Sequence, residues 1–235
     1  MRQTELIMLG TGNAAVTRCY NTCFALRTDR GILLTDAGGG NGILVQLEKA
    51  GIAVTDIHDI FVTHAHTDHV LGVIWMIRTV AQQMQQGKYE GELRVWGHDK
   101  ALQVIDWICR MTLPAKIVAR LGVGIHLCEV KDGEGFEACG LKLKAFDIFS
   151  TKEKQFGFRA YLPTDSGWSA WGTSHTTSAT AVRWREPTGS CVRLSACMPT
   201  RPLQALREAS QYGHGCGTPG RRAEGEASGT LSHGG

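Results

Sequence analysis

The segment FVTHAHTDHV, residues 61–70, places three histidines and an aspartate within six positions, directly after an apolar run. His64 and His66 are two residues apart in an extended segment, so both rings point to the same side. Asp68 and His69 follow where a helical pattern begins, close enough to face the same space. Imidazole nitrogens with a carboxylate oxygen suit Zn²⁺, Mn²⁺ or Fe²⁺ rather than Ca²⁺. The motif therefore predicts a metal centre at the end of a buried strand.

The spacing of these ligands also predicts how many ions they bind. Four ligands so close in the chain cannot easily surround one tetrahedral ion, because the connecting backbone is too short. Two neighbouring ions, each bound by part of the cluster, are the easier geometry. Such a pair can hold a bridging hydroxide as the nucleophile and stabilise the charge of a phosphodiester or acyl transition state. The alternative is a polar loop of solvated histidines, and the whole pattern after a buried strand argues against it.

Residues up to about 160 alternate strand and helix patterns. Strands are predicted at residues 5–10, 56–66, 92–97, 124–130, 141–150 and 156–162, with a hairpin at 24–38 that turns at Arg30 and Gly31. Amphipathic helices are predicted at residues 41–51, 70–87 and 100–111. This alternation indicates an α/β or layered α+β fold class.

The composition changes near residue 160. No Lys follows Lys154, no Phe follows Phe158 and no Asp follows Asp165, while Ser, Thr, Gly and Arg become frequent. We therefore divide the chain into residues 1–160 and an atypical tail, residues 161–235. The tail is either a flexible, low-complexity segment or the product of a shifted reading frame near residue 162. We favour the shifted frame, because Arg without Lys and scattered Trp are typical of GC-rich DNA translated out of frame.

Composition and charge describe an ordinary globular protein. The net charge of +3 is too small to indicate nucleic acid or membrane binding by itself. The N-terminal apolar run is too short for a secretory signal, and no later run is long enough to span a membrane. We therefore expect a cytoplasmic protein without a membrane partner, whose eight cysteines are mostly buried free thiols. A homo-oligomer is compatible with the sequence.

The sequence THAHTDH resembles the signature of the metallo-β-lactamase superfamily, and its surroundings resemble the ribonuclease Z-like branch. LGTGNAAVTRCYNTCFAL is similar to the first strand, glycine turn and second strand of that branch. LLTDAGGGNGILVQLEKAGI is similar to its acidic segment and following helix, and ELRVWGHDKALQVID to a later strand, turn and helix. The resemblance covers about residues 5–160. It implies an αββα sandwich, incomplete on its C-terminal side, with metals at one edge of the two sheets.

The resemblance also implies roles for the motif residues. His64 and His66 would bind the first of two zinc ions, and Asp68 and His69 the second, with Mn²⁺ and Fe²⁺ as alternative metals. Asp68 would be the catalytic residue that orients or deprotonates the attacking water. Asp36 would lie behind the site as a carboxylate that orients the histidines.

Three further ligands of the family are missing or unplaced. Phe149 stands where a third histidine is expected, and phenylalanine has no donor atom for a metal. Asp165 lies in an LPTDSG turn instead of the Gly-Asp turn expected for a bridging aspartate. The candidates for a late histidine, His175, His214 and His233, lie in the atypical tail. The sequence therefore predicts weak binding of a single metal and little turnover.

The substrate stays open within the hydrolase hypothesis. The ribonuclease Z-like resemblance implies a phosphodiester, including the 3′ end of a precursor tRNA, but the chain has no long basic Gly/Pro-rich arm to bind tRNA. A smaller phosphodiester or an ester fits equally well, and lactam hydrolysis fits less well. The alternative to an enzyme is a degenerate family member that binds metal or another ligand without catalysis.

Other patterns in the sequence have no predicted role in catalysis. GTGNAA, residues 10–15, with Asp36 matches a dinucleotide-binding fingerprint, but the sequence that follows lacks the required helical pattern. We therefore predict a tight turn at these glycines. His58 and His98 each lie beside an aspartate and are predicted to be solvated. A set of cysteines in apolar patterns is assigned to the core, namely Cys109, Cys128 and Cys139.

Overall fold

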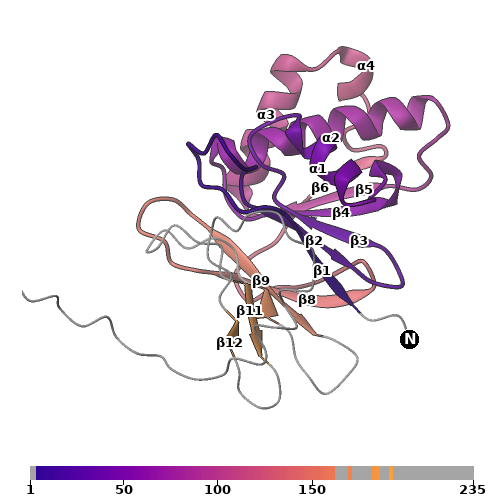
Figure 1. Cartoon of the computed structure of the whole chain (residues 1–235). Coiled ribbons are helices and arrows are strands. Elements are labelled where there is room, and N and C mark those ends of the chain that lie inside the picture. The colour runs from indigo at the N-terminus through magenta and orange to yellow at the C-terminus, as the bar shows by residue number, and fades with distance from the viewer. Residues whose placement is uncertain (1–3, 162–168, 171–181, 186–190, 193–235) are drawn as a thin grey trace, which may run out of the picture. The chain divides into compact units, whose positions relative to one another are not determined.

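The computed structural model describes residues 4–161 and three short strand segments, residues 169–170, 182–185 and 191–192 (Figure 1). The hypotheses about Asp165, about a late histidine and about the reading frame of the tail concern residues outside this description. The division of the chain at residue 160 therefore stays a prediction.

The first sheet is mixed, and its strands follow one another in chain order. They are β1 (Glu5–Gly10), β2 (Cys23–Arg27), β3 (Ile32–Thr35), β4 (Ile57–Val62), β5 (Leu93–Gly97) and β6 (Ile125–Glu129). The pairs β1–β2 and β2–β3 are antiparallel, whereas β3, β4, β5 and β6 run parallel. Parallel strands bring their carboxyl ends to one edge of a sheet, and this edge carries the histidine motif.

Helices connect the parallel strands and cover one face of the first sheet (Figure 1). They are α1 (Gly42–Lys49), the 3₁₀ turn η1 (Val54–Asp56), α2 (Thr67–Gln85), α3 (Asp99–Thr112) and α4 (Ala115–Val118). Their apolar sides and the sheet form one buried cluster that includes Leu47, Ile77 and Ile105. The strand β4 is buried along almost its whole length and ends in three apolar residues, 60–62.

The second sheet is antiparallel. Its strands are β7 (Gly135–Ala138), β8 (Leu141–Asp147), β9 (Phe156–Tyr161), β10 (Ser169–Ala170), β11 (Val182–Arg185) and β12 (Cys191–Val192). Strand β8 alternates strictly at first: Leu141 and Leu143 are buried, whereas Lys142 and Lys144 are exposed. This alternation gives the second sheet one apolar face and one charged face.

The apolar face of the second sheet packs against the first sheet. Phe61 of β4 contacts Phe158 of β9 edge to face, with ring centroids 4.9 Å apart. Phe24 and Leu33 from the first sheet join the same buried cluster as Leu143 from the second. The described residues therefore form helix, sheet and sheet layers. This arrangement confirms the predicted fold class, with no helix on the outer face of the second sheet within the described part of the chain.

Most predicted elements are present, and the differences are local. The helix α2 begins at Thr67, three residues before the predicted start, so Asp68 and His69 belong to its first turn. Strand β7 and helix α4 were not predicted, because both are too short to show a periodic pattern. No helix begins directly after Gly12. Gly12 instead pairs with Asn21 in an isolated bridge, so the turn interpretation of GTGNAA is confirmed.

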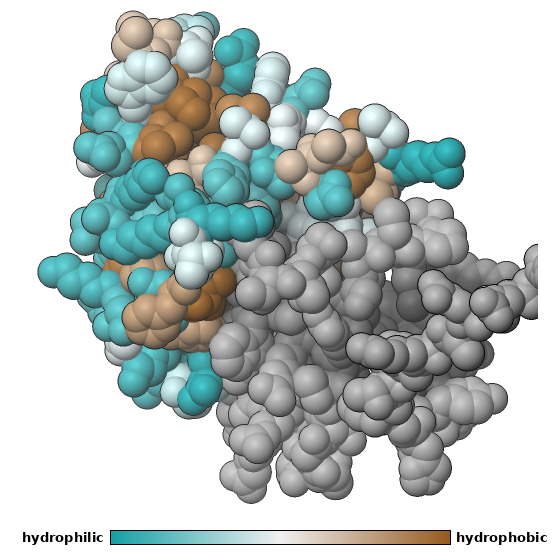
Figure 2. All heavy atoms as spheres, turned by 90° about the vertical axis from the view of Figure 1, so that its left-hand side faces the viewer, coloured by the Kyte–Doolittle hydropathy of each residue, from teal (hydrophilic) through white to brown (hydrophobic). Residues whose placement is uncertain are grey.

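The described residues also show the surface and the burial of the cysteines. Among the described residues, no helix combines the length and apolar character needed to cross a membrane. On the face shown in Figure 2, hydrophobic residues form separate patches among hydrophilic ones. Cys109 and Cys139 are buried, as predicted, whereas Cys128 is only half-buried. Burial raises the pKa of both buried thiols to about 12.

Candidate metal centre

Three of the motif residues meet at the carboxyl ends of β3 and β4. His64 follows β4 in the chain, and its ring centroid lies 4.6 Å from that of His66 and 4.0 Å from that of His69. His64 and His69 are buried, whereas His66 is half-buried. The tertiary structure therefore gathers the three imidazole rings in one place, as the sequence predicted.

The first turns of α2 are held close to the loop that follows β3. The amide of Gly72 donates to the carbonyl of Gly38 at 2.8 Å, and the amide of Ala37 donates to the carbonyl of His69 at 3.2 Å. A Cβ atom at Gly72 would lie 1.7 Å from the carbonyl oxygen of Ala37, which no side chain can tolerate without movement of the backbone. Glycine at this position therefore allows the approach that places His69 beside Asp36.

Asp36 is a buried carboxylate that joins the two loops. Its Oδ1 accepts a hydrogen bond from the amide of Thr63 at 2.9 Å, and its Oδ2 accepts from the Thr63 hydroxyl at 2.8 Å. The same Oδ2 lies 2.7 Å from Nδ1 of His69. Asp36 has a φ of 52°, a left-handed backbone conformation that aspartate tolerates better than most residues. It occupies the supporting position that the resemblance implied.

These hydrogen bonds orient two histidines through one carboxylate. The Thr63 hydroxyl donates a hydrogen bond to Asp36. Its oxygen can therefore accept a hydrogen bond from Nδ1 of His64, 2.9 Å away. Nδ1 of His69 donates to Asp36 directly. In both rings the protein therefore engages Nδ1, which makes Nε2 the nitrogen available for a metal.

Asp68 faces the other side of the His69 ring. Its Oδ2 lies 3.4 Å from Nε2 of His69. Burial alone would lower the pKa of His69, but the charge and hydrogen bond of Asp36, together with Asp68, raise this pKa to about 9. Burial alone would raise the pKa of Asp68, but the hydrogen bond and charge of His69 lower it to about 2. In the metal-free protein these shifts favour a charged pair of Asp68 and His69.

The segment between β8 and β9 closes one side of the cluster. The side-chain amide of Gln155 lies 3.3 Å from Nδ1 of His64. Lys100 in the first turn of α3 pairs with Glu153 at 2.8 Å, and Lys154 pairs with Asp99. The hydrogen bond from Lys100 is the main reason why the pKa of Glu153 is lowered, with a smaller contribution from the charge of His66.

Phe149 lies in the same segment and provides no metal ligand. Its side chain is 80% exposed, and its backbone has a φ of 52°, which is rare for a bulky residue. Its amide donates to Oδ1 of Asp147 at 2.8 Å, which stabilises this local turn. A third histidine ligand is therefore not supplied at this position.

The donors fit zinc in kind but do not form a complete site. Three imidazoles and a carboxylate are typical zinc ligands. Oδ2 of Asp68 and Nε2 of His69 lie 3.4 Å apart. However, no group of three or more His, Cys, Asp or Glu side chains within the described residues is arranged to hold a metal ion. The described residues therefore carry donors of the kind that zinc uses without forming a complete zinc site.

The prediction that His98 is solvated is wrong, and the same prediction for His58 holds only in part. His98 is fully buried after β5, with its ring centroid 5.2 Å from that of Phe156. It caps α3 by accepting from the amide of Ala101 at 3.4 Å, and burial, followed by the charge of Lys154, lowers its pKa. His58 is half-buried and lies 3.0 Å from the Tyr89 hydroxyl. Both rings pack against neighbours that lie far away in the chain, which a polar local sequence does not reveal.

Sequence reasoning also missed two residues that contact His64, namely Thr63 and Gln155. Thr63 directly precedes the motif, and its position at the end of β4 was a usable signal. Gln155 had no signal, because only the fold brings it to His64.

Comparisons with known proteins agree with this architecture. A model of the family described as anti-Pycsar protein Apyc1 matches residues 4–160. Ribonuclease Z of Thermococcus kodakarensis is 39% identical over 149 residues, which are 63% of this chain and 42% of that protein. Ribonuclease Z of Pyrococcus abyssi is 34% identical over 102 residues, 43% of this chain and 31% of that protein. The chain thus spans well under two thirds of the length of the curated relatives that it matches.

Solved structures show the same fold. The metallo-β-lactamase fold protein YhfI from Bacillus subtilis is 15% identical, with a TM-score of 0.52 over 67% of this chain and 58% of that one. The short form of human tRNase Z is 20% identical, with a TM-score of 0.51 over 66% and 62% of the two chains. The ribonuclease Z-like resemblance is therefore confirmed, and the family match adds a more specific relationship that the motif alone did not reveal. The chain belongs to the anti-Pycsar protein Apyc1 family and has a metallo-β-lactamase fold.

Proposed function

We propose that this chain is a metal-dependent hydrolase that cleaves a phosphodiester, with zinc held by His64, His66, Asp68 and His69. The observation that carries the proposal is the gathering of three imidazole rings, two of which are oriented by Asp36. Asp36 engages Nδ1 of His69 directly and that of His64 through Thr63. A bound divalent cation would supply Lewis-acid activation of water and of a phosphoryl oxygen. The ribonuclease Z relatives support an RNA phosphodiester as the substrate class.

The chain's own residues would then orient the reactants. Asp36 and Thr63 hold the histidine rings, and Asp68 accepts a hydrogen bond that aligns the attacking water. Lys100 and Lys154 fix the segment that carries Gln155, which limits access of solvent to His64 on that side. Because Phe149 supplies no ligand, we expect weak binding of a single metal and slow turnover.

The test begins with metal-free protein titrated with zinc by isothermal calorimetry. We expect binding of about one zinc ion, weakened at least about tenfold in His69→Ala, since even partners of ligands contribute tenfold to a hundredfold. His58→Ala, near the other end of β4, is the control and should bind zinc like the wild type. Absence of zinc binding would overturn the proposal, and tight binding of two ions would overturn the single-metal expectation.

Activity then separates hydrolysis from simple metal binding. Zinc-loaded protein is assayed with bis(p-nitrophenyl) phosphate and, for ester cleavage, with p-nitrophenyl acetate. The exposed, non-ligating Phe149 and the lack of a three-ligand group among the described residues favour a second candidate, a family member that binds metal without turnover. Zinc binding with no hydrolysis of either compound would identify that candidate.

A further inference from the structure

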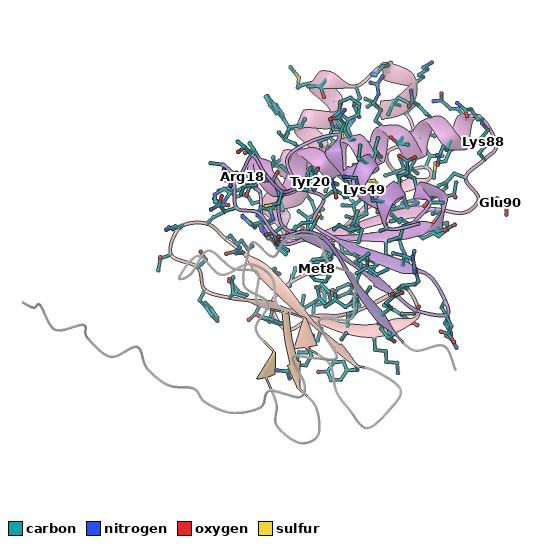
Figure 3. All side chains as sticks on the ribbon, in the orientation of Figure 1. Met8, Arg18, Tyr20, Lys49, Lys88 and Glu90 are labelled. Carbon is teal, nitrogen blue, oxygen red and sulfur yellow. The ribbon has the colours of Figure 1, made fainter. Side chains whose placement is uncertain are left out.

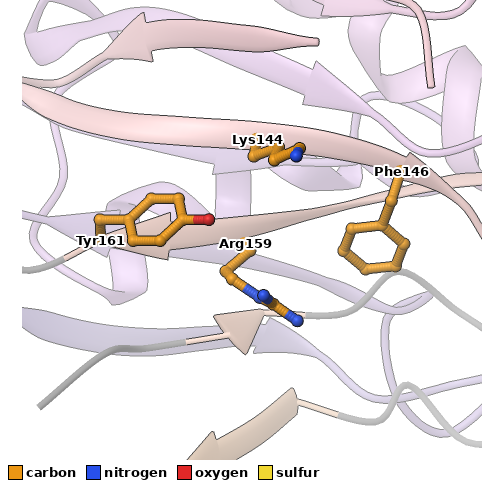
Figure 4. A pocket seen from close by; sticks show the side chains of 4 residues that line it. All are labelled: Lys144, Phe146, Arg159 and Tyr161. Carbon is orange, nitrogen blue, oxygen red and sulfur yellow. The ribbon is translucent and has the colours of Figure 1, made fainter. Parts of the chain in front are cut away.

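The outer face of the second sheet carries a hollow that is separate from the histidine motif. It has a volume of about 270 Å³, and the described residues that line it are Lys144, Phe146, Arg159 and Tyr161. Figure 4 shows the two cationic side chains between the two aromatic rings. The hollow therefore combines positive charge with flat apolar surfaces.

The sheet register creates this combination. Lys144 of β8 lies directly across from Arg159 of β9, and Lys142 lies across from Tyr161. Residues two apart in a strand point to the same face, so Lys142, Lys144 and Phe146 follow one another along β8. None of these features is visible from either strand alone.

The positive charge on this face is not neutralised within the described part of the chain. Lys142, Lys144 and Arg159 form no ion pair there, unlike Lys100 and Lys154 near the histidine motif. Glu137 of β7 lies across from Lys142, at the end of the row farthest from Phe146. Two adjacent cations without acidic partners favour an anionic ligand over a neutral or cationic one.

The aromatic side chains indicate which kind of anionic ligand fits this hollow. Tyr161 is 46% exposed, so its ring can contact a ligand. Proteins bind single-stranded nucleic acids by stacking bases on such rings while neighbouring cations contact phosphates, often on the face of a sheet. A phosphate alone would use the cations but not the exposed Tyr161 ring.

We propose that the outer face of β8 and β9 binds single-stranded RNA, with Lys144 and Arg159 contacting phosphates and Tyr161 stacking on a base. Phe146 forms the apolar wall at the other end of the hollow. This site is additional to the proposed hydrolase centre and does not require a metal. Strand β8 leads into the segment that holds Gln155 against His64, so RNA bound here would lie on the strand that leads to the histidine motif.

The test uses the full-length protein in EDTA, so that a metal-held phosphate cannot contribute. Binding of a short fluorescein-labelled oligouridylate is followed by fluorescence anisotropy. The double variant Lys144→Glu/Arg159→Glu should weaken binding at least tenfold. The slope of log affinity against log salt concentration should also fall by about 1.4, at about 0.7 for each phosphate contact.

Matched variants separate this site from a general charge effect. Lys49→Glu/Lys88→Glu makes the same change in net charge at α1 and beyond α2, positions labelled in Figure 3, and should bind like the wild type. Tyr161→Ala should weaken binding about tenfold, whereas Tyr161→Phe, which keeps the ring, should not. These residues are exposed, and their variants should retain the thermal unfolding midpoint of the wild type.

Three outcomes would overturn the proposal. They are no binding by the wild type, equal losses in the pocket and control variants, and equal affinity for duplex RNA, in which the bases cannot stack on Tyr161. Zinc binding and hydrolysis by the same preparations show separately whether the proposed hydrolase function fails.

Discussion

The carboxyl edge of the first sheet and the outer face of the second sheet use charge in opposite ways. At the edge, Asp36 and His69 are buried, and each polar atom of Asp36 has an identified donor. On the outer face, Lys144 and Arg159 are exposed and have no ion pair within the described residues. A buried charge is stable only when it is paired, whereas an exposed cation keeps its hydration until a ligand arrives.

The difference predicts where substitutions will destabilise the fold and where they will alter only binding. The edge should be sensitive to the loss of any partner, because a group left behind stays buried. The outer face should tolerate substitution, because water replaces the lost contact.

The largest effect is expected for Asp36→Ala. The change removes three hydrogen bonds and leaves a buried imidazole without its counter-charge. Breaking a buried pair from one side typically lowers the free energy of unfolding by about 3–5 kcal/mol. Urea unfolding of the metal-free protein measures this loss, with Asp29→Ala, an exposed residue in the hairpin turn, as the control. Equal stability of the two variants would show that Asp36 does not organise the edge.

A smaller loss is expected for Gly72→Ala. In an exposed helix this change would stabilise by up to about 1 kcal/mol, but here the new methyl group meets the Ala37 carbonyl oxygen. We expect destabilisation of about 1–3 kcal/mol, as is typical of overpacking. Gly40→Ala is the control, because no atom lies within 4 Å of its added Cβ. A gain in stability for Gly72→Ala would contradict the close approach of α2 to this loop.

The ion pairs between α3 and the segment that precedes β9 should contribute less to the free energy of unfolding. Lys100 and Lys154 are more than one third exposed, so solvent screens their pairs with Glu153 and Asp99. We expect Lys100→Ala to lower the free energy of unfolding by less than about 1 kcal/mol. In urea titrations the difference from the wild type should shrink further with added sodium chloride. A loss that is insensitive to salt would mean that packing, rather than charge, holds the segment.

The smallest effect is expected for the buried thiols as pH rises. An ordinary thiol ionises near pH 8.5, but burial raises the pKa of Cys109 and Cys139 to about 12. Both should therefore remain protonated and unreactive up to about pH 9. Mass spectrometry after native iodoacetamide treatment should find neither modified at neutral pH or at pH 9, whereas urea-unfolded protein should be modified at both. Increased labelling of Cys139 in the folded protein at higher pH would show that the core between the sheets opens.

Much of the fold was predictable because its signals are local. Apolar alternation and helical periodicity identified the main strands and helices, and the glycine between Arg30 and Ile32 identified the hairpin turn. The elements that were missed are too short for a period to develop, namely β7, β10, β11, β12, α4 and the turn η1. The burial of His98 was predicted wrongly, since it depends on the ring of Phe156, which lies far away in the sequence.

The identity and spacing of the proposed metal donors, and the order of the elements that present them, follow from the sequence. These features depend on residue chemistry and on the geometry of neighbouring residues, so one segment contains the information. The packing of the folded chain, in contrast, brings Asp36 to Thr63, 27 residues away, and Gln155 to His64, 91 residues away. It also decided which cations and rings share the outer face of β8 and β9. Such contacts depend on strand register and on the packing of layers, in which many weak interactions across the whole chain are optimised together.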